Sequence, residues 1–313
     1  MVKSISPTIE GGLLVAITVI LGLVTVFVPI IGIFFDFFFA VPLAVLTVRH
    51  GAAKGLLALF VTFVLLSMLI SPLFSLRVTL NVGICGVVLG QGVRKNFSAV
   101  RIFFTTFMIA SASQFFSLVF LSLLTGVDVI AEQEKMMRGA FTVYAAMGVE
   151  KNLLEQALQM VMLLIPTLLM LTALLNTVMI WLASKWIFVK LQIKMPSLPP
   201  FVAWKFPVLF FYLAAFGGLG IYWGTTRGWT EINLISTNLL FGSLALGFIQ
   251  SMSCFFFLAE RFKLTNFFRV MLFVMVFINP FMWQITAMMG LIDMLVDYRE
   301  ILRKRDEETR NDE

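Results

Sequence analysis

Charge is scarce in this sequence. Only 13% of the 313 residues are Asp, Glu, Lys or Arg, whereas 60% are hydrophobic, and the mean hydropathy is +0.99. A soluble domain has about 25% charged and about 45–50% apolar residues, so this chain could not cover its own surface in water. These proportions exclude a free cytoplasmic enzyme, a secreted disulfide scaffold and a disordered tail. Lipid must be the solvent for most of the chain.

Residues that carry metal and redox chemistry are equally few. His50 is the only histidine, and Cys85 and Cys254 lie in separate uncharged runs. These counts exclude an HExxH zinc site and a disulfide framework. The sequence also lacks GxSxG, GxxxxGK[ST] and a glycine-rich dinucleotide turn. We therefore predict that the chain is no enzyme and has no catalytic residue, metal or cofactor.

Long runs without Asp, Glu, Lys or Arg fill the rest of the chain. A helix that crosses a bilayer needs about 20 mostly apolar residues. On this basis the sequence predicts an all-α, polytopic transmembrane helix bundle with about nine membrane segments. The first run, 11–35, is broken at 29–32, and 33–48 then forms a shorter second segment. The others are 55–76, 78–93, 102–127, 156–184, 206–226, 232–259 and 270–292.

Basic residues at the ends of these runs predict the orientation. Most Lys and Arg before the tail fall in cytoplasmic connections if the N-terminus lies inside, as expected in a bacterial inner membrane. The net charge of +6 then reflects contact with anionic headgroups of the bilayer, and no nucleic acid is expected as a partner. Asn279 and Pro280 interrupt the last run, so the side of the C-terminus stays open.

Two connections divide the chain. The long polar insertion 128–155 faces outward on this topology, with an interfacial helix expected over 131–147. It forms either a lid over a site or a connector at headgroup level. The second connection, 195–207, contains several prolines and is expected to be a stiff cytoplasmic linker. The predicted organisation is a six-segment bundle (1–194), this linker, a three-segment membrane part (208–298) and a charged tail (299–313).

Polar residues within the membrane are the candidates for a site. Asp36 lies between two phenylalanines, and a charge in lipid is expensive. Arg77 lies at a similar depth on the predicted topology, and Asn81 follows it by one helical turn. Together with Gln114, these residues are predicted to line an outward-facing pocket that binds a small solute. A structural ion pair between helices would explain Asp36 and Arg77 equally well, and this alternative stays open.

A second candidate polar site lies at the end of the last run. Asp293 and Asp297 are four residues apart and share one helix face. Paired carboxylates can relay protons or bind a cation, whereas a solvated salt network with Arg299 and the basic tail is the alternative. Single amides such as Asn238 and Gln250 are expected to form hydrogen bonds between helices.

Two short motifs link the chain to a known family. The segments LPPFVAWKFP (198–207) and GLIDMLVDYR (290–299) resemble segments of the YybS-type family of bacterial integral membrane proteins of unknown function. This resemblance implies that the six-helix N-terminal part is similar to the substrate-binding (S) subunits of energy-coupling-factor transporters, and to the cell-shape membrane protein MreD. The transporter subunits dock their partner through AxxxA patches, for which Gly12 and Ala16 are the nearest equivalent here.

The leading expectation is therefore a transporter-type membrane component that binds or passes a small solute. A separate energising or envelope protein in the membrane is its expected partner. The runner-up is a non-transporting scaffold that organises envelope or other membrane proteins.

Overall fold

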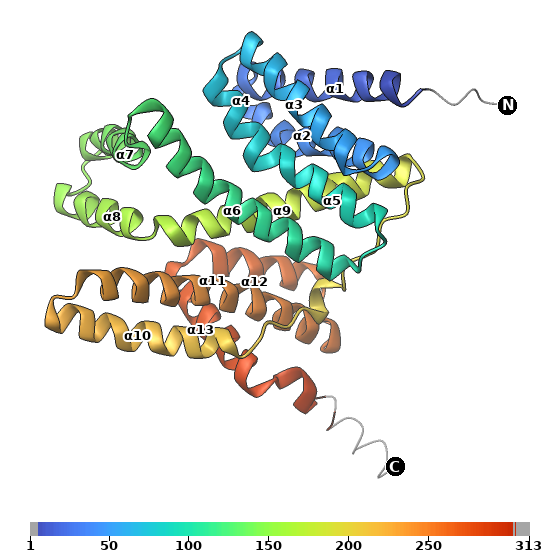
Figure 1. Ribbon diagram of the computed structural model, residues 1–313. Helices are drawn as coiled ribbons and strands as arrows, with labels where there is room; N and C mark the ends of the chain where they lie inside the picture. Colours follow the sequence, from blue (N-terminus) through green and yellow to red (C-terminus); the bar gives the residue numbers. More distant parts are fainter. Residues whose placement is uncertain (1–5, 303, 305–313) are drawn as a thin grey trace, which may run out of the picture. The chain divides into compact units, whose positions relative to one another are not determined.

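The computed structural model describes residues 6–302 and 304, and within this part the regular structure is all helical, without strands (Figure 1). The predicted all-α fold is therefore confirmed. Of the charged tail, 303 and 305–313 lie outside the described residues, as does the extreme N-terminus, 1–5. The elements are α1 (Pro7–Phe27), α2 (Pro29–His50), α3 (Ala52–Leu69), α4 (Pro72–Val78), the π-helical turn η1 (Thr79–Gly83), α5 (Ile84–Arg94), α6 (Ala99–Thr125), α7 (Val129–Ala146), α8 (Lys151–Leu163), α9 (Ile165–Lys190), the 3₁₀ turn η2 (Phe201–Ala203), α10 (Leu209–Arg227), α11 (Thr230–Arg261), α12 (Asn266–Ile278) and α13 (Pro280–Val296).

Several of these helices can cross a membrane. In the described part of the chain, six spans are long and apolar enough: α1, α3, the continuous α4–η1–α5, α6, α9 and α11. A seventh is formed if α12 and α13, which are bent by 107° at their junction, make one broken span. The expected number of nine is not confirmed. One reason is α10, whose four glycines, two tyrosines and tryptophan lower its hydropathy.

Apolar side chains cover the outside of the helices. Met68, Leu123 and Phe267 are 80%, 78% and 71% exposed, and many other large apolar side chains on these helices are exposed as well. Large contiguous apolar surface is unfavourable in water but matches the hydrocarbon of a bilayer. The protein is therefore a multi-pass membrane protein whose surroundings are lipid.

The chain forms two compact units. The first comprises Met1–Leu154 and Leu168–Leu198, and the second comprises Glu155–Thr167 and Pro199–Glu313. The boundary between Leu198 and Pro199 lies in the proline-rich segment that the sequence predicts as a linker. The segment Glu155–Thr167, which the predicted N-terminal bundle includes, belongs to the second unit.

Helix α2 lies at the centre of the first unit. Its residues 39–47 are all buried, and α5 packs directly on them. This close approach requires glycine, because a Cβ on Gly86 or Gly90 would overlap the carbonyl oxygen of Ala40 or Ala44. Small residues allow helix backbones to approach in this way in membrane proteins, where van der Waals packing holds helices together.

The polar insertion 128–155 contains the expected helix. Asp128 caps the start of α7 by accepting hydrogen bonds from the backbone N–H groups of Ile130 and Ala131. No described residue of α7 is buried, and apolar residues such as Met136 and Tyr144 are 64% and 51% exposed. A helix with this surface fits the interface between headgroups and acyl chains.

In the second unit, an amide of α11 bridges the break between α8 and α9. In a continuous helix the Thr167 N–H would donate to the Leu163 carbonyl. Instead, Asn238 Oδ1 accepts from Thr167 N at 3.0 Å, and Asn238 Nδ2 donates to the Leu163 carbonyl at 2.9 Å. One side chain thus satisfies both groups that the break leaves free, as membrane interiors require.

The second unit is otherwise built on α11. This helix packs against both α10 and α13 (Figure 1). At its crossing with α13, a Cβ on Gly290 would overlap the carbonyl oxygen of Gly247. Between α12 and α13, Asn279 caps the new helix by accepting from Phe281 N at 2.9 Å. The chain therefore restarts as a helix directly after the break.

Candidate functional site

The proline-rich segment 195–207 contains backbone carbonyl groups that need hydrogen-bond donors. Pro199, Pro200 and Pro207 have no N–H and stop helix formation, so that the segment forms only the short turn η2. Its carbonyl groups consequently lack the regular partners of a helix. Within a membrane protein such groups must be satisfied by other parts of the protein.

Arg299 supplies these donors. Its Nη1 donates to the carbonyl of Val202 at 2.7 Å and its Nη2 to that of Trp204 at 2.8 Å. Nη1 also donates to Ser253 Oγ at 3.0 Å, and Nη2 to Asp293 Oδ2 at 3.3 Å. The side chain is only 6% exposed. A guanidinium is suited to this position because it offers five N–H donors in a fixed plane.

Asp293 balances the charge of Arg299. It is 2% exposed, and its Oδ2 also accepts from Gln250 Nε2 at 2.6 Å. The other end of the same amide, Gln250 Oε1, accepts from Phe206 N at 3.0 Å. Gln250, Ser253, Asp293 and Arg299 form what we call the buried polar cluster. It joins α11, the end of α13 and the proline-rich segment.

A left-handed residue shapes the end of α13. Helix α13 stops at Val296, and Asp297 has φ +51°, a conformation that Asp tolerates better than most residues. The chain turns there, and Tyr298 N donates back to Asp293 Oδ1 at 3.2 Å. Arg299 can then reach Asp293 from the following turn.

Asp297 has a cation of its own. It forms an ion pair with Lys205 of the proline-rich segment. Partial burial raises the pKa of Asp297. The hydrogen bonds from Lys205 and from Glu300 N and the nearby charge of Arg299 lower the pKa by more than burial raises it, so that it lies below its usual 3.8. The two carboxylates are thus paired with different cations.

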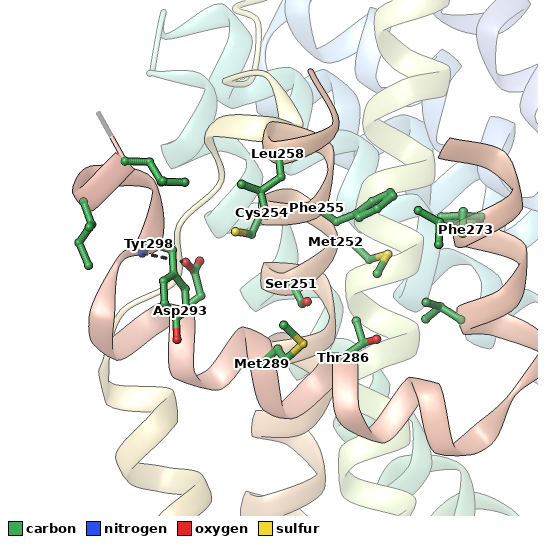
Figure 2. A pocket seen from close by; sticks show the side chains of 14 residues that line it. Ser251, Met252, Cys254, Phe255, Leu258, Phe273, Thr286, Met289, Asp293 and Tyr298 are labelled. Carbon is green, nitrogen blue, oxygen red and sulfur yellow. Dashed lines mark hydrogen bonds between the residues drawn. The ribbon is translucent and has the colours of Figure 1, made fainter. Parts of the chain in front are cut away.

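A cavity lies beside the buried polar cluster. It has a volume of about 480 Å³ and is bounded by α11, α12, α13 and the turn that follows α13. Figure 2 shows the side chains of Ser251, Thr286 and Met289 at the same space, with Asp293 to one side. The lining residues are Ser251, Met252, Cys254, Phe255, Leu258, Leu272, Phe273, Val276, Thr286, Met289, Asp293, Tyr298, Ile301 and Leu302.

The cavity has the features of a small-molecule site. Its volume lies within the range of about 300–1,000 Å³ that is usual for ligand pockets. Most of its wall is apolar; Asp293, Cys254 and Tyr298 lie toward one end, and Ser251 and Thr286 are the polar residues elsewhere in the wall. Such a wall can bury an apolar ligand while a few polar groups orient it.

The first unit holds the other predicted residues. Asp36 lies in α2, Arg77 in the last turn of α4 and Asn81 in η1. The charge of Arg77 acts on Asp36, although no ion pair within 4 Å joins them in the described structure. Asp36 Oδ1 and Asn81 Oδ1 are both buried without a hydrogen-bond partner. Unsatisfied polar atoms beside a π-helical turn mark a place that merits functional testing.

Gln114 has a different observed partner. It lies in α6, and the hydroxyl of Thr172 in α9 approaches its side-chain amide at 2.8 Å. This contact joins two helices, as expected of a single amide in a membrane bundle. The outward-facing pocket of Asp36, Arg77, Asn81 and Gln114 remains a prediction.

Sequence reasoning found only part of the buried polar cluster. Asp293 was a candidate, and Arg299 was expected beside it in a solvated salt network, whereas the observed pair is buried. Gln250 was expected only to join helices, and Ser253 was not considered. The missing signal was the pairing of two motifs: 198–207 supplies the carbonyl acceptors, and 290–299 supplies Asp293 and Arg299. Both motifs are the ones that carry the family resemblance.

Comparison with known proteins agrees with that resemblance. Residues 16–294 match the model of a family described as "Predicted membrane protein (DUF2232)". The uncharacterised protein YybS of Bacillus subtilis (strain 168) is 22% identical, over 93% of this chain and 97% of the relative. No solved structure matches the chain.

Proposed function

We propose that this chain, which belongs to the DUF2232 family of predicted membrane proteins, is a transporter-type membrane component that binds or passes a small solute. The observation that carries this proposal is the cavity of about 480 Å³ between α11, α12 and α13. The proposed role is binding rather than catalysis. The buried ion pair at the cavity holds the proline-rich segment in place, which is a structural use of both charges.

The buried polar cluster offers a way to couple binding to movement. Asp293 lines the cavity and also bonds Arg299, which in turn holds the carbonyls of Val202 and Trp204. A solute that contacts Asp293 therefore acts on the group that fixes the proline-rich segment. A ligand shifts an equilibrium between two arrangements by its difference in affinity for them.

Filling the cavity tests the proposal. Thr286→Phe places a ring in the cavity, whereas Ile285→Phe places the same ring at a neighbouring position of α13 that is 39% exposed and outside the lining. The two variants and the wild type are reconstituted in nanodiscs and heated with a panel of alcohols, fatty acids, amines and isoprenoids. A ligand that binds only the folded protein raises its unfolding temperature. We expect a shift in the wild type and in Ile285→Phe but not in Thr286→Phe, and equal responses of all three would refute a cavity site.

We further propose that the basic end of the first unit faces the cytoplasm of a bacterial inner membrane. Arg94 Nη1 donates to the Val48 carbonyl at 3.4 Å, which brings the α5–α6 turn to the α2–α3 turn. Glu10 of α1 pairs with Arg49 and His50 at the same end. Basic residues gather at this end, in keeping with the positive-inside rule.

Cysteine labelling in intact cells tests this orientation. Ala53→Cys lies at the basic end, and Ala140→Cys lies in α7; both positions are exposed. We expect an impermeant maleimide to modify Ala140→Cys only. Modification of Ala53→Cys alone would reverse the topology.

A membrane partner is the remaining part of the proposal. On α1, a Cβ added to Gly12 meets no atom within 4 Å, and Ala16 is exposed. Such a small-residue patch suits close approach of another helix, whether an energising protein or, for a scaffold, an envelope protein. A photo-crosslinker at Gly12 should give one discrete product, and the same crosslinker at Leu13 should give none. Identical products from both positions would count against the patch.

A further inference from the structure

The described charges at the cavity are paired. Among the lining residues that the structure describes, Asp293 alone carries a formal charge, and it is paired with Arg299. The neighbouring Asp297 is paired with Lys205. An ionised ligand would therefore lose its hydration at this end of the cavity without gaining a counter-charge. An uncharged ligand would avoid most of this desolvation cost.

Asp293 nevertheless keeps the capacity to accept a hydrogen bond. Its Oδ2 accepts from Gln250 and Arg299, and its Oδ1 accepts from Tyr298 N at 3.2 Å. Cys254 lines the same cavity as this carboxylate. A carboxylate offers about four acceptor positions, and S–H is a weak donor. A hydroxyl group on a ligand would donate to the remaining acceptor position more strongly than a thiol could.

The remainder of the wall matches a hydrocarbon chain. Met252, Phe255, Leu258 and Phe273 line the cavity away from Asp293, and Met289 faces the same space (Figure 2). Methionine side chains adapt their shape to irregular apolar ligands. The cavity therefore has one end with a buried carboxylate and a long wall that is apolar except for Ser251 and Thr286.

We infer that the cavity binds an uncharged single-chain amphiphile with a hydroxyl head, its O–H donating to Asp293 and its chain lying along the apolar wall. This inference rests on the proposed function and names the class of its solute. The hydroxyl amphiphile comes either from the surrounding bilayer or from the aqueous phase, and its recognition chemistry is the same in both cases.

Four probes with one chain length test the head-group preference. Decanol has the hydroxyl, decyl methyl ether has no donor, and decanoate and decylamine are charged near neutral pH. The readout is alkylation of Cys254, which lines the cavity, in protein carrying Cys85→Ala and reconstituted in nanodiscs. We expect decanol to protect Cys254 at a concentration at least about tenfold lower than the other three probes, which is the factor that one hydrogen bond to a charged group supplies.

The outcomes separate this inference from the proposed function. Equal protection by all four probes, or better protection by a charged one, overturns the hydroxyl head but leaves the cavity as a binding site. If no probe protects Cys254 more in the wild-type cavity than in Thr286→Phe, both the hydroxyl head and the cavity site are overturned. If decanol protects best, mass spectrometry of an organic extract identifies the source: a hydroxyl lipid retained from the native membrane assigns the bilayer, and an empty extract assigns the aqueous phase.

Discussion

Replacing Arg299 tests how the second unit is held together. Arg299→Met keeps the length of the side chain but removes its charge and its donors. The carboxylate of Asp293 then stays buried and keeps the hydrogen bonds from Gln250 Nε2 and Tyr298 N. The carbonyls of Val202 and Trp204 lose the donors that Arg299 gives them.

The size of the effect follows from burial. Removal of one partner of a buried ion pair destabilises a protein by about 3–5 kcal/mol, whereas an exposed pair contributes about 0–1 kcal/mol. The matched control is Lys205→Met, because Lys205 pairs with Asp297 in the same segment but its side chain is 51% exposed. We expect Arg299→Met to lose several times more unfolding free energy than Lys205→Met.

Reversible denaturation in a mild detergent measures both variants, and limited proteolysis reports on the proline-rich segment. Cleavage between 199 and 207 should accelerate in Arg299→Met at temperatures where the rest of the protein is folded. Adding Asp293→Leu to Arg299→Met should recover part of the stability, because both buried charges are then gone. If Arg299→Met and Lys205→Met lose equal free energy, the buried polar cluster does not hold the segment.

Four further changes have defined outcomes. Gly290→Leu should prevent the close crossing of α11 and α13 and abolish the folded monomer in size-exclusion chromatography, whereas Gly218→Leu, which has open space, should not. Asp297 has a lowered pKa, so its ion pair stabilises the protein above pH 3.8 and is lost as the pH falls below that value; Asp297→Asn should flatten a stability profile measured between pH 3 and pH 6. Asn238→Leu should lower the unfolding free energy by about 1–3 kcal/mol, because it leaves two buried backbone groups unsatisfied. Asp36→Asn should leave thermal stability unchanged or raise it, because an amide is cheaper to bury than a carboxylate with one unpartnered oxygen; a large loss would show that the charge itself is needed.

The helical membrane fold could be predicted from the sequence, because the length of an apolar run directly indicates a helix that crosses lipid. Breaks were accessible where proline marks them, as before α2 and α13. The number of spans was harder to predict. Helix α10 contains glycine and aromatic residues, and their effect on whether the helix crosses the membrane depends on how it packs. Assignment of Glu155–Thr167 to the second unit depends on Asn238, whose partner lies 71 residues away in the chain.

The candidate site shows a similar division. Asp293 could be singled out because a carboxylate at the end of an apolar run is unusual. The residue that pairs with Asp293 is Arg299 and not Asp297, which lies four residues further on. The left-handed turn at Asp297 redirects the chain and brings Arg299 back to Asp293. The acceptors in 198–207 carry no side-chain signal at all, since they are backbone carbonyls exposed by proline.

The central claim, that the cavity of the second unit holds a small ligand, is tested most directly by native mass spectrometry of the protein released from its own membrane. The claim predicts a bound species of defined mass, retained from the membrane or formed when decanol is added, on the wild type and on Ile285→Phe, and none on Thr286→Phe. A wild-type protein that stays bare even after decanol is added, or the same adduct on Thr286→Phe, would contradict it.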